Sequence, residues 1–261
     1  MRRSALVVVL VSALGLTGAQ AVGLPDTGQT LCDDGSNVLV PCSSTNTGDA
    51  AAYPRQDGRF GRDAKAAAGT LVKVGGGSAG FDYTKIANNG SDLTAGAALG
   101  SNPADWACTR DNITGLTWEV KTSDGGVRDW NWSYGWYSTD SATNGGNAGG
   151  TSGNACSSTL NSCDTEALAA AVNGAALCSY TDWRLPTTRE LFTLVHFGAQ
   201  SPSIDAAFFP NTRASFFWSA STYSHSAALA WIVDFYDGNS PGPYSKSYNN
   251  YFVRLVRGGH F

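Results

Sequence analysis

The chain of 261 residues carries 17 Lys and Arg against 21 Asp and Glu, which gives a formal net charge of −4. This acidic balance argues against general binding to nucleic acids or to anionic lipids. The length suits a compact domain with an N-terminal extension. No apolar run after residue 21 is long enough for a membrane helix, so we expect a soluble mature protein.

The start of the chain, residues 1–21, predicts a secretory signal peptide. Arg2 and Arg3 form a basic start, Ala5–Leu16 is an apolar stretch, and Ala19–Ala21 has the small-x-small pattern of a cleavage site. Cleavage would remove the two arginines, so the net charge of −4 would become −6. No cysteine directly follows the site, which disfavours a lipoprotein. We therefore expect a protein exported to the periplasm, the cell surface or the medium.

The six cysteines predict three disulfides, because thiols oxidise outside the cytosol and loop-rich folds gain from cross-links. Two pairs are close in sequence and lie among Gly, Ser, Asn and Asp residues that turn the chain back, which leaves a third pair. Metal ligation is disfavoured, because there is no CxxC and no cysteine is closely followed by a histidine. The expected pairs are Cys32 with Cys42, Cys156 with Cys163, and Cys108 with Cys178.

Residues 22–105 are rich in Gly, Ala, Asp, Asn and Ser, and we expect an extension of loops and short hairpins without a core of its own. One strand is predicted there, at Thr70–Val74. The compact domain is predicted to cover residues 106–261. It begins where Trp106–Lys121 brings apolar and β-favouring residues around an Asn-Ile-Thr-Gly turn.

The segment Asp129–Tyr137 carries a large aromatic residue at every second position, so these rings project from one face of an extended chain. Aromatic ledges bind sugars. Aromatic rings also fill the cores of loop-rich domains, and this second interpretation is the more common one. The Gly, Asn, Ser and Thr residues that follow, up to Asn154, predict an exposed loop.

Two helices follow. An Ala-rich run predicts a helix at Glu166–Leu177, capped by Asp164 or Thr165. A capping box, Thr187 to Glu190, opens a second helix at Arg189–Phe197. The residues on its inner face are Leu191, Leu194 and Val195.

Three strands are predicted after the helices, at Phe216–Ser221, Ala230–Tyr236 and Tyr251–Val256, each bounded by Gly, Pro, Asn or Ser. The order of strand, helix, helix and further strands is typical of an α+β fold.

Five motifs stand in a fixed order along the chain. They are Asp111–Trp118 (DNITGLTW), Asp182–Leu191 (DWRLPTTREL), Phe208–Thr212 (FFPNT), Phe217–Ser221 (FWSAS) and Val253–Gly259 (VRLVRGG). Together they resemble the Lcl C-terminal domain family, which is named for a domain of a collagen-like adhesin. The segment Thr27–Cys42 is similar to the N-terminal hairpin of such proteins.

The resemblance implies a fold similar to the C-type-lectin and formylglycine-generating-enzyme folds. We therefore expect a loop-rich, disulfide-braced α+β domain with two helices and a twisted, mostly antiparallel sheet. The family includes an adhesin domain that engages sulfated polysaccharides, and some members are varied near the C-terminus by diversity-generating retroelements. Within the second motif we expect structural roles: Trp183 is buried, Arg184 pairs with a carboxylate, and Pro186 starts the helix.

The loop Asp237–Asn250 is dominated by Tyr, Ser, Asn and Gly, the composition with which antibody loops bind their ligands. In a lectin-like fold this loop and Ser221–Ser226 would share one face. An ordinary solvated hairpin loop is the alternative. The residues predicted to bind a ligand are Tyr223, His225, Tyr244, Lys246, Tyr248 and Asn249.

No residue pattern supports catalysis. A GxSxG match at Gly76–Gly80 is followed by no plain helix, as a nucleophile elbow would require. No cysteine follows Cys178, so the cysteine pair of formylglycine-generating relatives is absent. The scattered histidines are His196, His225 and His260, and the few glutamates, Glu119, Glu166 and Glu190, suggest no acid/base pair.

We expect no cofactor. Calcium remains an alternative, since Asp234, Asp237 and Asn239 lie near the proposed binding face, although their spacing matches no EF-hand loop.

The leading hypothesis is an exported adhesion module that recognises a glycan, such as a sulfated polysaccharide, or a surface protein through its C-terminal loops, without catalysis. One alternative is a structural subunit of a surface appendage or envelope assembly. Another is a hypervariable binding protein of a diversity-generating retroelement, because Asn, Tyr, Ser and Asp cluster near the C-terminus.

Overall fold

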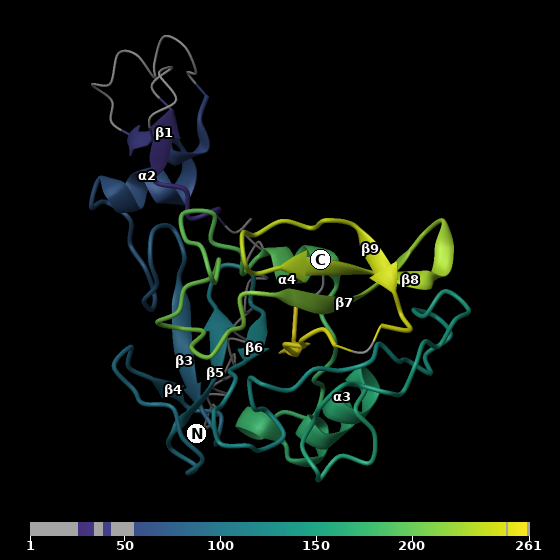
Figure 1. The fold of residues 1–261 in the computed structure, drawn as a ribbon. Helices are drawn as coiled ribbons and strands as arrows, with labels where there is room; N and C mark the ends of the chain where they lie inside the picture. The colour runs from purple at the N-terminus through teal and green to yellow at the C-terminus, as the bar shows by residue number, and fades with distance from the viewer. Residues whose placement is uncertain (1–25, 34–38, 43–54, 249, 260–261) are drawn as a thin grey trace, which may run out of the picture.

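The structure is a computed structural model that describes residues 26–33, 39–42, 55–248 and 250–259. The predicted signal peptide, residues 1–21, and the candidate ligand residue Asn249 lie outside the described residues. Within them the chain forms three antiparallel sheets, three α-helices and two short 3-10 helices (Figure 1). The expected α+β class is confirmed.

The largest sheet has five antiparallel strands in the order β10-β6-β5-β3-β4. The turn between β5 and β6 is the predicted Asn-Ile-Thr-Gly turn, in which the Asp111 carboxylate accepts hydrogen bonds from Ile113 N and Thr114 Oγ1 at 2.8 and 2.7 Å. Gly115 takes a φ of 73°, a left-handed conformation that suits glycine. In chain order the strands are β3 (Tyr83–Ala87), β4 (Asp92–Leu93), β5 (Trp106–Asp111), β6 (Thr117–Glu119) and β10 (Val256–Arg257).

Two strands of this sheet come from before residue 106, where the compact domain was expected to begin. β3 is buried along its whole length and pairs with β5. The predicted strand Thr70–Val74 is wrong, because this segment pairs with no strand in the described chain, and Val72 and Val74 are 89% and 81% exposed. Its apolar alternation resembles that of a strand, but no neighbouring strand covers it.

A second sheet has three strands, β7 (Phe216–Tyr223), β8 (Ser226–Asp234) and β9 (Pro243–Ser245). The first two form a hairpin that is longer than predicted. The predicted strand Tyr251–Val256 exists only at its end, because this segment crosses from one sheet to the other. Phe252 bridges to β7, and Val256 pairs with β6.

The two predicted helices are confirmed but are shorter than expected. α3 (Thr165–Gly174) is capped by Asp164, whose Oδ1 accepts from Ala167 N at 2.8 Å. A 3-10 helix, η2 (Leu177–Ser179), follows it after Ala176, which has a φ of 47°.

α4 (Thr188–Phe192) has the predicted capping box of Thr187 and Glu190. Pro186 precedes the N-cap and does not itself start the helix. α4 ends early because the backbone N–H groups of His196 and Phe197 bond to Ser203 and Thr27, outside the helix. Tertiary contacts therefore set where this helix stops.

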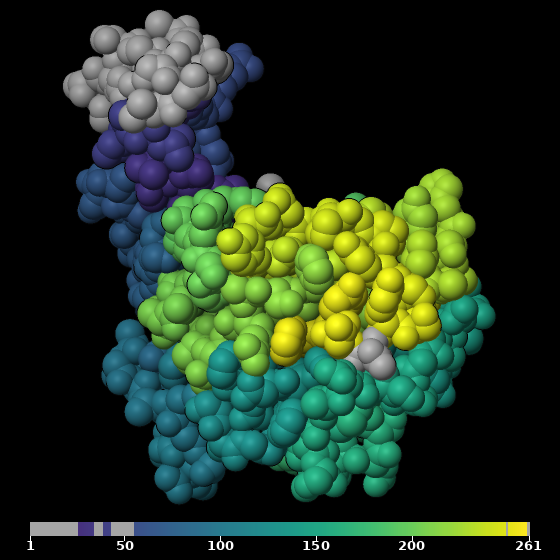
Figure 2. Space-filling view, viewed as in Figure 1, coloured from purple at the N-terminus to yellow at the C-terminus, as the bar shows by residue number. Residues whose placement is uncertain are grey.

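The first described residues form an arm, which we define as residues 26–33, 39–42 and 55–68. It contains the hairpin of β1 (Leu31–Asp33) and β2 (Leu39–Pro41), which fits the expected N-terminal hairpin, the 3-10 helix η1 (Asp57–Arg59) and the unpredicted α2 (Gly61–Ala67). Figure 2 shows the arm projecting from the rest of the molecule. We call residues 75–248 and 250–259 the body.

The body has two apolar cores, one on each face of the three-stranded sheet. Because successive strand residues face opposite sides, Trp218 lies in one core and Phe217 in the other. Tyr134 and Trp136 fill the first core, and the Trp136 indole donates to Ser219 O at 2.8 Å. For these two rings the core interpretation of the aromatic segment Asp129–Tyr137 is therefore confirmed.

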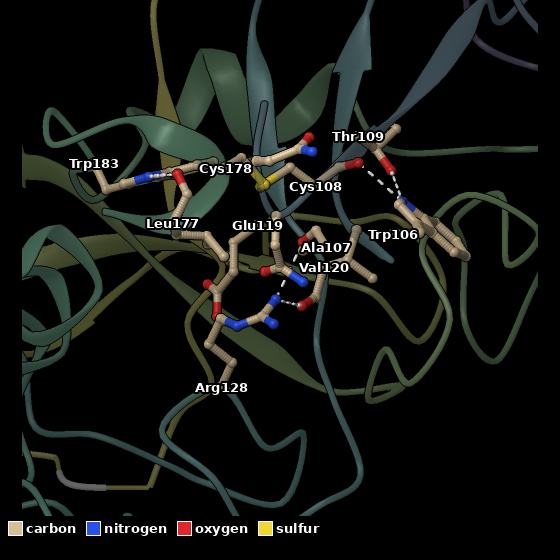
Figure 3. Close-up of a disulfide and its surroundings, with 12 residues drawn as sticks. Trp106, Ala107, Cys108, Thr109, Glu119, Val120, Arg128, Leu177, Cys178 and Trp183 are labelled. Atoms are coloured by element: carbon tan, nitrogen blue, oxygen red, sulfur yellow. Dashed lines mark hydrogen bonds between the residues drawn. A yellow bond between two sulfur atoms is a disulfide. The ribbon is translucent and has the colours of Figure 1, made fainter. Parts of the chain in front are cut away.

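All three predicted disulfides are present: Cys108–Cys178 and Cys156–Cys163 brace the body as expected, and Cys32–Cys42 lies in the arm. Figure 3 shows the bond between Cys108 on β5 and Cys178 on η2. Beside it, the Arg128 guanidinium donates to the backbone carbonyls of Ala107 and Val120 at 3.1 and 2.7 Å. The disulfide ties the five-stranded sheet to the helical side of the body, and Arg128 ties the loop after β6 to the same sheet.

Candidate functional site

Four aromatic rings meet where the C-terminal segment crosses the body, and we call them the tyrosine cluster: Phe216, Tyr244, Tyr248 and Tyr251. The Tyr251 ring centroid lies 5.3 Å from that of Phe216, 5.6 Å from Tyr244 and 6.1 Å from Tyr248. Tyr248 lies 6.2 Å from Tyr244 and is 52% exposed, whereas Tyr244 and Tyr251 are half-buried. The C-terminal residues coloured yellow form part of the face of the body seen in Figure 2.

The cluster is positioned by backbone pairing. Tyr244 lies opposite Ala230 on β8, and so faces the same core as Ala230. The chain then turns, with Tyr248 N donating to Ser245 O at 2.9 Å. Tyr251 is held because its carbonyl accepts from Tyr134 N at 2.9 Å. The sheet and the core thus fix two rings, and the turn places the third above them.

The cluster offers apolar ring faces together with hydroxyl groups. Burial, and then the neighbouring tyrosines, raise the pKa of the Tyr251 phenol to about 12. This hydroxyl therefore stays protonated at neutral pH and can donate a hydrogen bond to a ligand.

Lys246 does not belong to this surface, although the sequence suggested it. Its side chain is 1% exposed, and its ammonium donates to Asn144 O, Asn147 O and Thr222 Oγ1 at 2.7, 2.9 and 3.1 Å. It also lies 3.8 Å above the Trp136 ring. All three ammonium donors are used, so this lysine ties loops together and offers nothing to an external ligand. Burial lowers its pKa to about 8.

The sequence carried no signal for the burial of Lys246, because it does not show which way Tyr244 faces; the pairing of Tyr244 with Ala230 shows it. Side chains two apart on a strand share a face, so an inward Tyr244 predicts an inward Lys246.

Tyr223 and His225 lie at the tip of the β7–β8 hairpin, away from the tyrosine cluster. Their rings are 5.2 Å apart, and Tyr223 packs edge-on against Trp231 at 5.6 Å. Trp231 directly follows Ala230 on β8, so the two side chains face opposite sides of the sheet. Tyr244 pairs with Ala230 and shares its side, whereas Tyr223 packs on the side of Trp231. The expectation that both loops share one face is therefore wrong, and the predicted surface is divided in two.

The acidic residues considered for calcium are occupied by local hydrogen bonds. Asp234 Oδ1 accepts from Tyr236 N at 2.8 Å, and the two oxygens of Asp237 accept from Asn239 N and Nδ2 at 3.0 and 2.8 Å. These bonds close the turn after β8.

An unpredicted group of three aspartates lies where the arm meets the body: Asp26, Asp57 and Asp63, with oxygens within 4.8 Å of one another. Thr27 Oγ1 donates to Asp57 and Asp63, Asp63 N donates to Asp26, and Gly80 N donates to Asp63 at 2.7 Å. Burial raises the pKa of Asp63 from 3.8 to about 6. These hydrogen bonds account for the group as a joint, so it is not assigned as a metal site.

Ser78 and His196, the residues nearest to a catalytic pattern in the sequence, make structural contacts. Gly76–Gly80 leads into β3 instead of a helix, and Ser78 N and Oγ both donate to Asp205 at 2.7 and 2.9 Å. The strand-turn-helix geometry of a nucleophile elbow is therefore missing at this serine. His196 packs against Phe81, and burial lowers its pKa.

The motif Asp182–Leu191 joins α4 to the C-terminal strand. Trp183 is buried, and Arg184 donates to both oxygens of Glu190 at 2.6 and 2.8 Å, as expected. Arg184 also pairs through its backbone with Val256, and Arg257 binds the Asp182 carboxylate at 2.8 and 3.0 Å. The motif therefore joins distant parts of the body.

A sequence model of the Lcl C-terminal domain family matches residues 107–257. The chain belongs to the Lcl C-terminal domain family. The match covers most of the body and every residue of the tyrosine cluster. No curated protein and no solved structure matches the chain, and the likeness to C-type lectins stays a prediction.

Membership of the Lcl C-terminal domain family and three disulfides together indicate an extracellular or cell-surface protein. In the part of the chain that the structure describes, no helix has the length and apolar character needed to cross a bilayer.

Proposed function

We propose that this protein is an exported binding module without catalytic activity, which recognises a glycan or a protein through the tyrosine cluster. The observation that carries the proposal is the arrangement of Tyr248, 52% exposed, beside the half-buried rings of Tyr244 and Tyr251. A signal peptide at residues 1–21 and a location at the cell surface or in the medium are part of this proposal.

The chemistry of the cluster suits ligands that have apolar faces and hydroxyl groups. Tyrosine rings stack against the C–H faces of sugars and against apolar side chains, and their hydroxyls form hydrogen bonds at the edge. Because packing already holds Tyr244 and Tyr251, little side-chain entropy is lost when a ligand binds. Lys246 is buried beside the cluster, which favours a neutral glycan or a protein over a sulfated polysaccharide.

The test is binding of the oxidised mature protein to a glycan array that includes neutral and sulfated polysaccharides, with and without calcium. Tyr248→Ala should weaken saturable binding by about tenfold, equivalent to about 1.4 kcal/mol, and should change stability by less than about 0.5 kcal/mol. Tyr236→Ala is the matched control, because Tyr236 is 57% exposed and lies outside the cluster. Equal loss in both variants, or no saturable binding to any glycan or cell-surface protein, would overturn the proposal.

A structural subunit of a surface assembly is the second candidate, and exposed apolar side chains before residue 75 favour it. Leu39, Phe60, Val72 and Val74 are between 55% and 89% exposed. An assembly subunit would bury these side chains against neighbouring copies. Light scattering over a range of protein concentrations tests this function. An assembly subunit should form oligomers as the concentration rises, and Val72→Lys or Val74→Lys should return it to the monomer.

A further inference from the structure

A pocket of about 420 Å³ opens between α3, the start of α4 and the segment 136–143. It shares no residue with the tyrosine cluster, so it is a separate site. The residues that line it include the apolar side chains of Trp183, Leu185 and Ala169 and the charged side chains of Arg184, Glu190, Glu166 and Asp140. A volume of this size falls within the range of about 300 to 1,000 Å³ typical of small-ligand sites.

The charges that line the pocket do not balance. Glu190 is buried and is neutralised by the two hydrogen bonds from Arg184. The hydrogen bonds to the other two carboxylates come from uncharged donors. Asp140 accepts from the N–H of residue 142 and the hydroxyl of residue 143, and Glu166 accepts from the N–H and hydroxyl of Thr139. Among the described residues, none of the ion pairs within 4.0 Å includes either carboxylate. Two negative charges are thus uncompensated.

Both carboxylates line the pocket, and Thr139 links the two residues. Glu166 accepts from Thr139 N at 2.6 Å and from Thr139 Oγ1 at 2.9 Å, so it holds the residue directly before Asp140. Asp140 is exposed and Glu166 half-buried, whereas Trp183 is buried. Both uncompensated carboxylates are therefore more exposed than Trp183.

We propose that this pocket binds a basic side chain of a partner polypeptide, an ammonium or guanidinium carried on an apolar stem. The stem packs against Trp183, Leu185 and Ala169, and the cation meets the carboxylates of Asp140 and Glu166. Charge complementarity makes this choice, because a sulfate or carboxylate would be repelled by the two uncompensated charges. The inference does not depend on the proposed function of the tyrosine cluster.

The binding test uses the full oxidised chain and three probes in NMR or calorimetric titrations: capped arginine, its uncharged analogue capped citrulline, and the free diamine 1,5-diaminopentane. Capped arginine should bind saturably, and capped citrulline at least about tenfold more weakly. Equal binding of arginine and citrulline, or no binding of arginine, would overturn the proposal. Binding of the diamine alone would overturn the polypeptide part and assign the pocket to a free amine.

Substitutions in and beside the pocket test whether capped arginine binds there. Ala169→Leu adds volume at the lining and should abolish binding, whereas Ala170→Leu, one residue on and exposed, should not. Glu166→Gln keeps a hydrogen-bond acceptor for Thr139 but removes the charge. It should weaken the binding of capped arginine about tenfold. Tyr248→Ala should leave this binding unchanged, which separates it from the tyrosine cluster. An unaffected Ala169→Leu variant would refute the pocket as the site.

Discussion

Two buried carboxylates, Glu190 in the body and Asp63 in the arm, differ in the protonation state that the fold favours. In the body, Glu190 is buried against the Arg184 guanidinium, 2.6 Å away, and its pKa lies below the usual value, because this pairing and the Thr187 cap outweigh burial. In the arm, Asp63 is fully buried, its neighbours include Asp26 and Asp57, and its pKa is raised to about 6. The fold therefore favours the ionised state of Glu190 in the body and the protonated state of Asp63 in the arm.

The family match sharpens this contrast. It begins at residue 107 and covers most of the body, but it includes no residue of the arm. The arm also exposes Leu39 and Phe60, whereas both cores of the body bury their large rings. The matched family domain therefore lies in the body, and the arm lies outside it.

The largest expected difference comes from the disulfides. Removing the body bond with Cys108→Ala and Cys178→Ala opens a loop with a sequence separation of 70 residues, and the chain-entropy relation gives a loss of about 4 kcal/mol. Removing the arm bond with Cys32→Ala and Cys42→Ala opens a separation of 10 residues, for which the same relation gives about 3 kcal/mol.

Thermal unfolding followed by near-ultraviolet circular dichroism measures both pairs of variants. The body pair should lower the main transition, because both sulfurs are buried beside the first core. The arm pair should leave that transition nearly unchanged and speed hydrogen exchange in α2. A common shift of the main transition in both would mean that arm and body unfold as one unit.

The second prediction concerns the paired carboxylate of the body. Arg184→Met leaves Glu190 buried without its cation, so we expect a loss of about 2 to 3 kcal/mol at pH 7. The matched control is Arg110→Met, because Arg110 and its partner Asp92 are 33% and 58% exposed; this pair should contribute less than about 1 kcal/mol. Urea denaturation measures both, and similar losses would contradict a special role for burial at Glu190.

Local signals in the sequence were sufficient for much of the body. The capping box at Thr187 needs only Glu190 three residues later, and the short-range cysteine pairs left Cys108 to bond with Cys178. The α+β class followed from the order of these elements. Each of these features depends on neighbours in sequence or on elimination, so no knowledge of the tertiary arrangement was needed.

Long-range contacts explain what was missed. α4 stops early because Phe197 N bonds to Thr27 O, and Lys246 is buried because its partners are Asn144 and Asn147, about a hundred residues earlier. The pocket is lined by segments from residue 136 to residue 220 that only the fold brings together. Residue composition indicated the tyrosine-rich loop, but the pairing of β9 with β8 determines which of its side chains face the core and which face solvent.

The third prediction concerns the protonated carboxylate of the arm. A pKa raised from 3.8 to about 6 means that the folded arm binds a proton more tightly than the unfolded chain. The stability that this bound proton contributes is complete below pH 4 and is lost as the pH rises through 6. The ionised state of Glu190 acts in the opposite sense, because the stability that it contributes is lost as the pH falls below its usual pKa.

Asp63→Asn mimics the protonated state, since its amide oxygen can accept from Gly80 N while its amino group faces Thr27 and the other two carboxylates. We expect this variant to stabilise the arm by about 1 to 2 kcal/mol at pH 7 and to have little effect at pH 4. Hydrogen exchange of the α2 amides at the two pH values measures it. A loss of protection at pH 7 would show that the charge of Asp63 stabilises the joint, and the contrast between arm and body would then fail.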